Sequence, residues 1–152
     1  LSIRLPTICV RPGKPNKAAS GFFSGIIREP LNGKEAILPV STDVRHWHAY
    51  LLPPQRFAYA ALIDLEKVGT RRALNLPGVS CTVEEQIEAL RDIAGNDVVA
   101  LIKPEPDDAV AKIVAGWPRD FAPDRALSLG FKAESNFHEI INTYITQDLP
   151  KS

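Results

Sequence analysis

Residues 4–16 read RLPTICVRPGKPN, and the interpretation of the whole chain starts from this stretch. The apolar run at positions 7–10 is typical of a buried strand, because it is short and ends at the turn signal of Pro12 and Gly13. Pro6 has no backbone N–H and fits poorly inside a central strand, so the strand is expected to start after it. The stretch therefore predicts a buried strand that leads into a stiff polar loop.

Further along the chain, short apolar runs alternate with amphipathic helices. Strands are expected within residues 36–40, 44–50, 72–76 and 98–102. Helices are expected from a Ser20 cap to Pro30, from Pro53-Pro54 through a face of Ala58, Ala61, Leu62 and Leu65, from Thr82 to Gly95, from an Asp107 cap to Gly116, and from about Ser135 onward. Thr82 and Glu85 have the spacing of a capping box. This alternation favours an α/β fold over all-α and all-β folds.

Composition excludes several classes of protein. The chain has 152 residues, which is the length of one domain. Its 18 basic and 18 acidic side chains balance, and the absence of a basic excess argues against a dedicated nucleic-acid surface. No apolar run approaches the ~20 residues of a membrane helix. Cys9 and Cys81 are too few for a secreted disulfide scaffold, so we expect reduced thiols and a cytoplasmic protein. The absence of Met and the start at Leu1 predict a chain that lacks its natural N-terminus.

A second stretch, residues 43–49 (DVRHWHA), adds specificity to the first. The two together resemble the extended short-chain dehydrogenase/reductases, the NAD-dependent epimerase/dehydratase family. That family has an arginine-containing strand and loop after its catalytic helix, and later an Arg-Asp-aromatic strand, in which His46 here replaces the Asp. Residues 11–31 and the ALSLGF stretch at 126–131 are most similar to the D-erythronate dehydrogenase-like branch, which oxidises a four-carbon sugar acid with NAD.

The resemblance implies an α/β fold: the C-terminal, substrate-binding portion of an extended Rossmann-type short-chain dehydrogenase, with the N-terminal nucleotide-binding half missing. Residues 1–16 would be the last part of the Rossmann sheet and the active-site loop, and residues 17–152 the substrate-binding region. The family's Gly-x-x-Gly-x-x-Gly turn and Tyr-x-x-x-Lys pair have no match in this sequence. No catalytic residue is therefore assigned, and the isolated chain is predicted to be inactive.

Cofactor contacts are expected in the loop after the first strand. In the family this loop passes the nicotinamide, which here implies NAD contacts from Pro12, Gly13 and Lys14. Gly13 permits close approach of the backbone and Pro12 stiffens it. An ordinary turn at the end of a strand is the alternative interpretation.

Substrate contacts are expected from Asn16, Ser20, Arg45 and His48. The resemblance implies that Arg45 binds an anionic group, for which a planar guanidinium suits a carboxylate. The alternatives are a turn-forming Asn16, a Ser20 that only caps its helix, a solvated Arg45 and a His48 that belongs to the core. His46 and His48 share a strand face, but a metal site with His138 or a carboxylate as third ligand is not expected.

The function implied by the resemblance is that of an NAD-dependent oxidoreductase that takes hydride from a carbinol of a sugar acid. A nucleoside-diphosphate-sugar epimerase or dehydratase is the alternative within the family. A stand-alone, non-catalytic binding module is the alternative from another class. The expected partners are the small-molecule substrate and the missing N-terminal half, with a homodimer as a further possibility.

Overall fold

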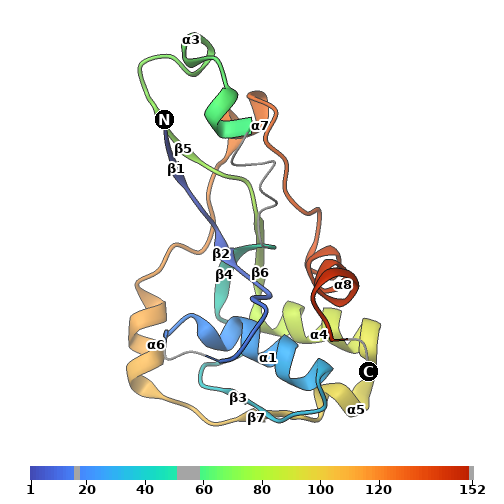
Figure 1. Ribbon diagram of the computed structural model, residues 1–152. Coiled ribbons are helices and arrows are strands. Elements are labelled where there is room, and N and C mark those ends of the chain that lie inside the picture. The colour runs from blue at the N-terminus through green and yellow to red at the C-terminus, as the bar shows by residue number, and fades with distance from the viewer. Residues whose placement is uncertain (16–17, 51–58, 151–152) are drawn as a thin grey trace.

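The computed structural model describes residues 1–15, 18–50 and 59–150. It is an α/β structure in which three small sheets are distributed along an elongated molecule (Figure 1). The strands are β1 (Ser2–Arg4), β2 (Thr7–Ile8), β3 (Ala36–Leu38), β4 (Arg45–Ala49), β5 (Ala73–Asn75), β6 (Val79–Thr82) and β7 (Ile102–Pro104). The expected α/β class is confirmed.

The pairing of these strands ties the start of the chain to its middle. β1 pairs with β5 and β3 pairs with β7, both in parallel. β4 is the central strand of the third sheet, parallel to β2 on one side and antiparallel to β6 on the other. The predicted strand at positions 7–10 is thus shorter than expected, and Ser2–Arg4 forms a strand of its own.

The helices gather mainly at one end of the molecule. They are α1 (Gly21–Leu31), α3 (Leu65–Val68), α4 (Val83–Ala94), α5 (Asn96–Val99), α6 (Asp108–Ala115), α7 (Asp124–Ser128) and α8 (Phe137–Gln147), and residues 59–62 are also helical. Figure 1 shows α1, α4, α5, α6 and α8 around the lower part, α3 and α7 beside β1 and β5 in the upper part, and the sheet of β2, β4 and β6 between them.

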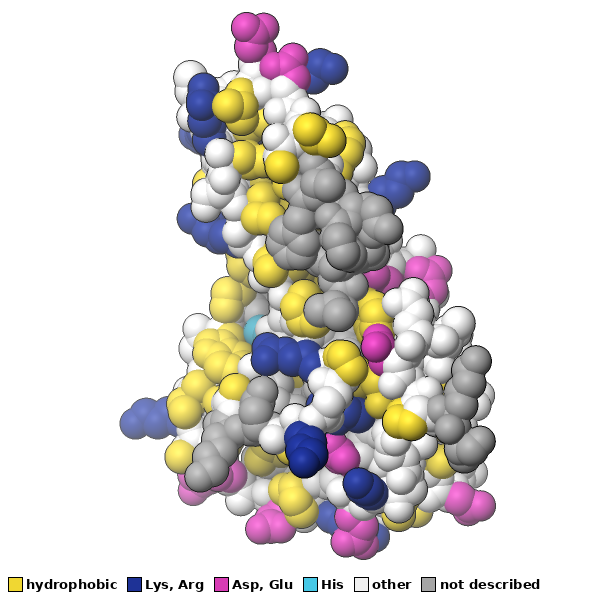
Figure 2. Space-filling view, viewed as in Figure 1, with side chains coloured by type: hydrophobic (Ala, Val, Ile, Leu, Met, Phe, Trp, Pro, Cys, Tyr) yellow, Lys and Arg dark blue, Asp and Glu magenta, His cyan; other side chains and the backbone are white. Residues whose placement is uncertain are grey.

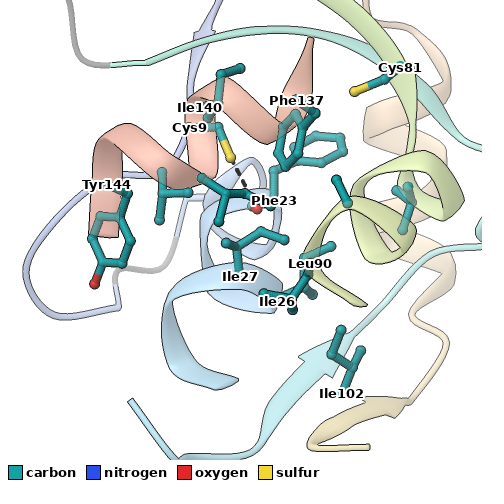
Figure 3. Packing of buried hydrophobic residues seen from close by; sticks show 14 of the residues in the cluster. Cys9, Phe23, Ile26, Ile27, Cys81, Leu90, Ile102, Phe137, Ile140 and Tyr144 are labelled. Carbon is teal, nitrogen blue, oxygen red and sulfur yellow. Dashed lines mark hydrogen bonds between the residues drawn. The ribbon is translucent and has the colours of Figure 1, made fainter. Parts of the chain in front are cut away.

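Two hydrophobic cores correspond to these two parts. The larger core packs α1, α4 and α8 together through fully buried side chains such as Ile27, Leu90 and Ile140 (Figure 3). Each fully buried Leu or Ile of this kind contributes about 1.5–3 kcal/mol relative to an exposed one. The smaller core lies in the upper part and includes Leu74 and Phe131. The larger of the two cores therefore lies in the lower part and includes residues next to the central sheet, such as Tyr50 and Cys81.

Helix starts follow the sequence signals closely. The Thr82 hydroxyl accepts from the Glu85 N–H at 3.1 Å, and the Glu85 carboxylate accepts from the Thr82 N–H at 2.6 Å, so the predicted capping box is confirmed. Asp107 caps α6 through the N–H groups of Ala109 and Val110, as expected. Ser20 lies at the N-cap position of α1, but its side chain makes no capping hydrogen bond.

Two expected elements have wrong boundaries, each for a local reason. Pro30 does not stop α1, since it lies in the last turn and removes only its own N–H, and the helix continues to Leu31. Residues 96–99 form helix α5 instead of a strand, and β7 starts only at Ile102, because a short apolar run has no period that separates the two states.

The helix expected to run through Leu65 is interrupted. Asp64 caps the separate short helix α3 by accepting from the Glu66 N–H. Leu62 is 84% exposed, so the predicted apolar face is not the buried one, and Ala60 and Val68 are buried instead. Pro53-Pro54 and Ala58 lie outside the described residues.

Both cysteines are buried and free of disulfides, as expected. Burial raises the pKa of the Cys9 and Cys81 thiols to about 12, so neither is a thiolate at neutral pH. In the described part of the chain, no helix combines the length and the apolar character needed to cross a membrane.

His48 is a core residue. Its side chain is fully buried, its Nε2 lies 3.0 Å from the side-chain nitrogen of Gln86, and its ring packs edge-on against Phe23 and Phe137. Burial, and to a smaller extent the neighbouring His46, lower the pKa of His48 well below 6.5. His48 is therefore neutral in the folded protein at neutral pH.

We predict that Thr82→Ala lowers the free energy of unfolding by about 1 kcal/mol, because the Glu85 N–H loses its acceptor and the box opens. Urea denaturation measures this change. Thr146→Ala is the matched control, since that exposed hydroxyl bonds only the Asn142 carbonyl within α8. Equal losses of stability in the two variants would contradict the structural role of the box.

We predict that stability falls as the pH is lowered below about 6.5. The unfolded chain takes up a proton on His48 near the ordinary histidine pKa of 6.5 while the folded chain does not, so protonation favours unfolding by up to about 1.4 kcal/mol per pH unit. NMR titration of the His48 ring in the folded protein should show an imidazole that is still neutral at pH 6.5, where an ordinary histidine is half protonated. Titration of that ring near pH 6.5 would show that it is not shielded from solvent as the structure indicates.

Candidate functional site

A cavity of about 360 Å³ lies where β1, β2, β4 and the segment after α6 meet. One part of its wall is apolar and is formed by Leu5, Trp47, Trp117, Pro118 and Phe121. The other part is polar and is formed by Arg4, Thr7, Ser20 and His46. A concave site with an apolar wall and a few convergent polar groups is the usual form of a small-molecule site.

The apolar wall is tightly packed. The rings of Trp47 and Phe121 lie 4.3 Å apart, measured between centroids. A side chain at Gly78 would come within 2.5 Å of the His48 carbonyl and 2.8 Å of the Trp47 indole nitrogen. Gly78 is thus needed so that the backbone can pass beside Trp47.

The polar wall contains a close side-chain pair. Thr7 Oγ1 lies 2.6 Å from His46 Nε2, and the His46 ring stacks on Phe23 at 5.0 Å with an interplanar angle of 7°. Burial lowers the pKa of His46, and a hydrogen bond to the Pro118 backbone opposes this change to a smaller extent. The imidazole is therefore held rigidly and is neutral at neutral pH.

Arg4 is the only basic residue that lines this cavity among the described residues. Its side chain is exposed, and its guanidinium makes one long hydrogen bond of 3.4 Å to the Asn75 side chain. Most of its donors are thus not engaged by that contact, and Arg4 lines a cavity that has no acidic side chain among its lining residues. This is an arrangement that attracts a single carboxylate.

Arg45 lies at the start of β4 and does not line the cavity. Its guanidinium donates to the Ser80 carbonyl at 3.0 Å and to the Glu85 carboxylate at 3.1 Å. Because Glu85 also closes the capping box on Thr82, Arg45 connects β4 to the start of α4. Arg45, which the resemblance implies as the anion-binding residue, thus makes contacts that hold the fold together.

The loop of Pro12, Gly13 and Lys14 is exposed. It is held against α1 at its start, since the Arg11 N–H donates to Ser24 Oγ and the Arg28 guanidinium donates to the Arg11 carbonyl at 2.7 Å. Gly13 has a φ of 90°, which L side chains rarely adopt, and a Cβ there would meet no atom within 4 Å. The loop therefore presents open backbone next to an anchored strand end.

The remaining expected residues lie in different places. Ser20 lines the cavity from the N-terminus of α1, whereas His48 lies in the core and Asn16 is outside the described residues. The sequence analysis did not single out Thr7 or Trp117. Thr7 could have been found from the alternation of strand side chains along residues 4–8, but a lone Trp after a helix carries no signal that separates a cavity wall from a core.

Side-chain types are unevenly distributed over the visible face of the molecule. Figure 2 shows hydrophobic side chains gathered along one side of the narrow middle and upper part, with acidic side chains mainly near the two ends. Among the described residues, no three His, Cys, Asp or Glu side chains lie close enough together to hold a metal ion.

Comparison with known proteins gives a consistent picture. No family model matches the chain. It is 49% identical to a D-erythronate dehydrogenase from Cupriavidus necator over 94% of its length, and 42% identical to a D-erythronate dehydrogenase from Haemophilus influenzae over 97% of its length. The solved structure of a nucleoside-diphosphate-sugar epimerase from Agrobacterium tumefaciens is 55% identical, covers 99% of the chain and superimposes with a TM-score of 0.92.

Each match covers nearly all of this chain but less than half of the relative. The chain spans 44% and 47% of the two dehydrogenases and 44% of the epimerase. The resemblance inferred from residues 4–16 and 43–49 is confirmed by these matches. The chain is thus similar in sequence to part of these dehydrogenases, and in sequence and fold to part of the epimerase.

Proposed function

We propose that this chain is the C-terminal, substrate-binding portion of an NAD-dependent oxidoreductase that removes hydride from a carbinol of a four-carbon sugar acid, with D-erythronate as the substrate. The observation that carries the proposal is the cavity, which combines one cation, a hydroxyl–imidazole pair and aromatic walls. The names of the two dehydrogenase relatives support the same substrate class.

The chemistry of the cavity fits a small hydroxy acid. Arg4 supplies N–H donors for a carboxylate, and Thr7 and Ser20 supply partners for hydroxyl groups. Trp47 and Trp117 offer apolar ring surface to the C–H groups of a sugar chain. We therefore propose Arg4 as the residue that binds the carboxylate, while Arg45, the residue implied by the resemblance, remains the competing candidate.

The upper sheet supports the proposal that another part of the protein completes the fold. Within residues 1–15, 18–50 and 59–150, β1 and β5 form a parallel sheet of two strands, whereas parallel sheets are normally larger and covered on both faces. Ser2 and Arg4 direct their backbone groups to β5, since the Ser2 N–H donates to the Arg72 carbonyl and the Leu76 N–H donates to the Arg4 carbonyl. By alternation, the N–H and C=O of Ile3 point to the opposite edge, where a further strand would pair.

The exposed loop supports the proposed NAD contact. Pro12, Gly13 and Lys14 follow the central sheet and project from the anchored strand end, where open backbone at Gly13 leaves room for close approach. NAD would supply the hydride acceptor. The glycine turn and the general acid/base pair would come from sequence outside these 152 residues, so residues 1–16 would complete the nucleotide-binding half and residues 17–152 would form the substrate-binding region.

The competing activity is that of a nucleoside-diphosphate-sugar epimerase, the name of the structural relative at 55% identity. A diphosphate carries at least two negative charges and is normally bound by several cations or by helix N-termini. Arg4 is the one basic residue lining the cavity in the described part of the chain. The cavity therefore fits a monocarboxylate better than a nucleotide sugar.

We predict that the complete protein, expressed from the whole reading frame that contains this chain, reduces NAD with D-erythronate and that the isolated 152 residues do not. Absorbance at the NADH band is the readout, with a nucleoside-diphosphate sugar as the competing substrate.

Arg4→Met should raise KM for D-erythronate about 10- to 100-fold, because a hydrogen bond to a charged group is lost.

The control for Arg4→Met is Arg91→Met, which removes an exposed cation that pairs with Glu88 on α4. Its KM should stay at the wild-type value. If Arg45→Met raises KM and Arg4→Met does not, the carboxylate is bound by Arg45. Conversion of the nucleotide sugar without NAD reduction would support the epimerase instead.

We predict that Gly13→Ala raises KM for NAD several-fold and leaves KM for D-erythronate unchanged. The added methyl forces the loop away from a φ of 90° and occupies the space of the proposed cofactor. Gly33→Ala is the matched control, since Gly33 also has a positive φ of 69° and open space but lies beyond the far end of α1. Equal effects on KM for NAD would show that backbone strain alone is responsible.

A further inference from the structure

Arg11 connects the buried end of the first segment to the exposed loop, and side chains of α1 bind both of its backbone groups. Val10 is fully buried, whereas Arg11 is exposed. The Arg11 N–H donates to Ser24 Oγ at 3.0 Å, and the Arg11 carbonyl accepts from Arg28 Nη1 at 2.7 Å. Ser24 and Arg28 stand at positions i and i+4 and therefore lie on the same side of the helix. We call these two side chains and the Arg11 backbone the Arg11 clamp.

The Arg11 clamp fixes the direction in which the chain enters the loop. Its two hydrogen bonds hold the peptide planes on both sides of the Arg11 Cα, so the φ and ψ of Arg11 cannot change without breaking one of them. The next torsion, the φ of Pro12, is locked by the proline ring at about −65°. The first backbone bond that can rotate freely is therefore the ψ bond of Pro12, immediately before Gly13.

The Arg11 clamp is buried and its charge is neutralised. Ser24 is 3% exposed and Arg28 is 6% exposed. The Glu29 carboxylate accepts from Arg28 Nε at 2.7 Å and pairs with Arg28 Nη2 at 2.6 Å, while Arg28 Nη1 donates to the Arg11 carbonyl. Apolar side chains of similar volume often stabilise a fold at least as well as a buried ion pair. What these polar groups provide beyond packing is therefore the fixed direction of their hydrogen bonds.

The helix that carries the clamp also reaches the cavity. Ser20 lies directly before α1 and lines the cavity, and Arg28 lies about 12 Å further along the helix axis. Cys9 adds another contact to the same helix, since its thiol donates to the Phe23 carbonyl at 3.2 Å (Figure 3). α1 is thus one rigid element that holds the start of the exposed loop at one place and a wall of the cavity at another.

We propose that Ser24 and Arg28 are positioning residues, which hold the loop of residues 12–14 in the orientation that binds NAD and at a set distance from the cavity. The proposal rests on the proposed function, since it takes this loop as the cofactor contact and the cavity as the sugar-acid site. Neither side chain lines the cavity, so both act through the Arg11 backbone. Hydride transfer requires its two reactants at a fixed mutual distance, which a loop and a cavity wall held by one helix provide.

Amide hydrogen exchange at Arg11 in the complete protein measures the clamp without any ligand. Ser24→Ala removes the acceptor of the Arg11 N–H, so exchange there should rise about tenfold. Arg28→Lys keeps a positive charge beside Glu29 but has one nitrogen where the guanidinium has three, so the Arg11 carbonyl loses its donor. Because the two bonds hold the same residue, exchange at the Arg11 N–H should rise about threefold in this variant as well. Unchanged exchange in Arg28→Lys would overturn the clamp.

Steady-state kinetics of the complete protein test the role in cofactor binding. Ser24→Ala and Arg28→Lys should each raise KM for NAD about three- to tenfold, because the loop must then be ordered when NAD binds. KM for D-erythronate should stay at the wild-type value, since neither side chain lines the cavity.

Asn136→Ala is the matched control for Ser24→Ala. It also removes a side-chain acceptor from a backbone N–H, that of Glu139 at the start of α8, and it should leave both KM values unchanged. A side chain with only a structural role would lower the stability of the fold and leave the ratio of the two KM values unchanged.

The possible failures are distinguishable. If exchange at Arg11 rises but KM for NAD does not, or if the two KM values rise together, the positioning role is overturned while the proposed function stands. If the wild-type protein does not reduce NAD with D-erythronate, the proposed function fails, and the assignment of Ser24 and Arg28 to cofactor binding fails with it.

Discussion

The pairing of β4 with a strand on each side is the constraint on which the rest of the structure depends. β4 is buried between β2 and β6, and its hydrogen bonds bring residues 7–8 and residues 79–82 to its two sides. At its start, Arg45 binds both the Ser80 carbonyl and the carboxylate that closes the Thr82 capping box. The position of α4, the largest helix of the lower core, is thereby coupled to the register of the central sheet.

The same strand also contributes side chains to both the core and the cavity. His48 packs into the core on Gln86, while His46, two residues earlier on the same face, reaches Thr7 at the cavity wall. Trp47 points to the other face and meets Phe121. Both histidines are neutral because of burial, but only His46 has a partner that contacts the cavity. Two positions on one strand therefore place His48 in the core and His46 at the cavity wall.

Much of the fold could be predicted because its signals are local. The Thr82–Glu85 box, the Asp107 cap and the apolar stripe of α8 each depend on residues within one or two turns of helix. The strand predicted at 98–102 is wrong at its start because a short run of Val and Ala is compatible with both a strand and a helix. The interruption before Asp64 was missed because the spacing of Ala61 and Leu65 fits one continuous helix.

The candidate site was harder to predict because it is assembled from distant segments. The cavity brings together Arg4, Thr7 and Trp117 only after β2 has paired with β4. No spacing in the sequence predicts that these residues lie close together. Arg45 has the right chemistry for an anion, but Glu85, distant in the sequence, takes up its guanidinium. Residue type and motif position thus lead only to a proposed class of ligand, because the partner of each side chain depends on tertiary contacts.

A crystal structure of the complete protein with NAD and D-erythronate would show directly which residues hold the sugar acid. We expect the sugar acid to occupy the cavity between Arg4 and the rings of Trp47 and Trp117, with its carboxylate on the Arg4 guanidinium and a hydroxyl within hydrogen-bonding distance of Thr7 Oγ1. A sugar acid bound elsewhere, with its carboxylate on Arg45 and this cavity filled by side chains, would refute the assignment of the cavity as the substrate site.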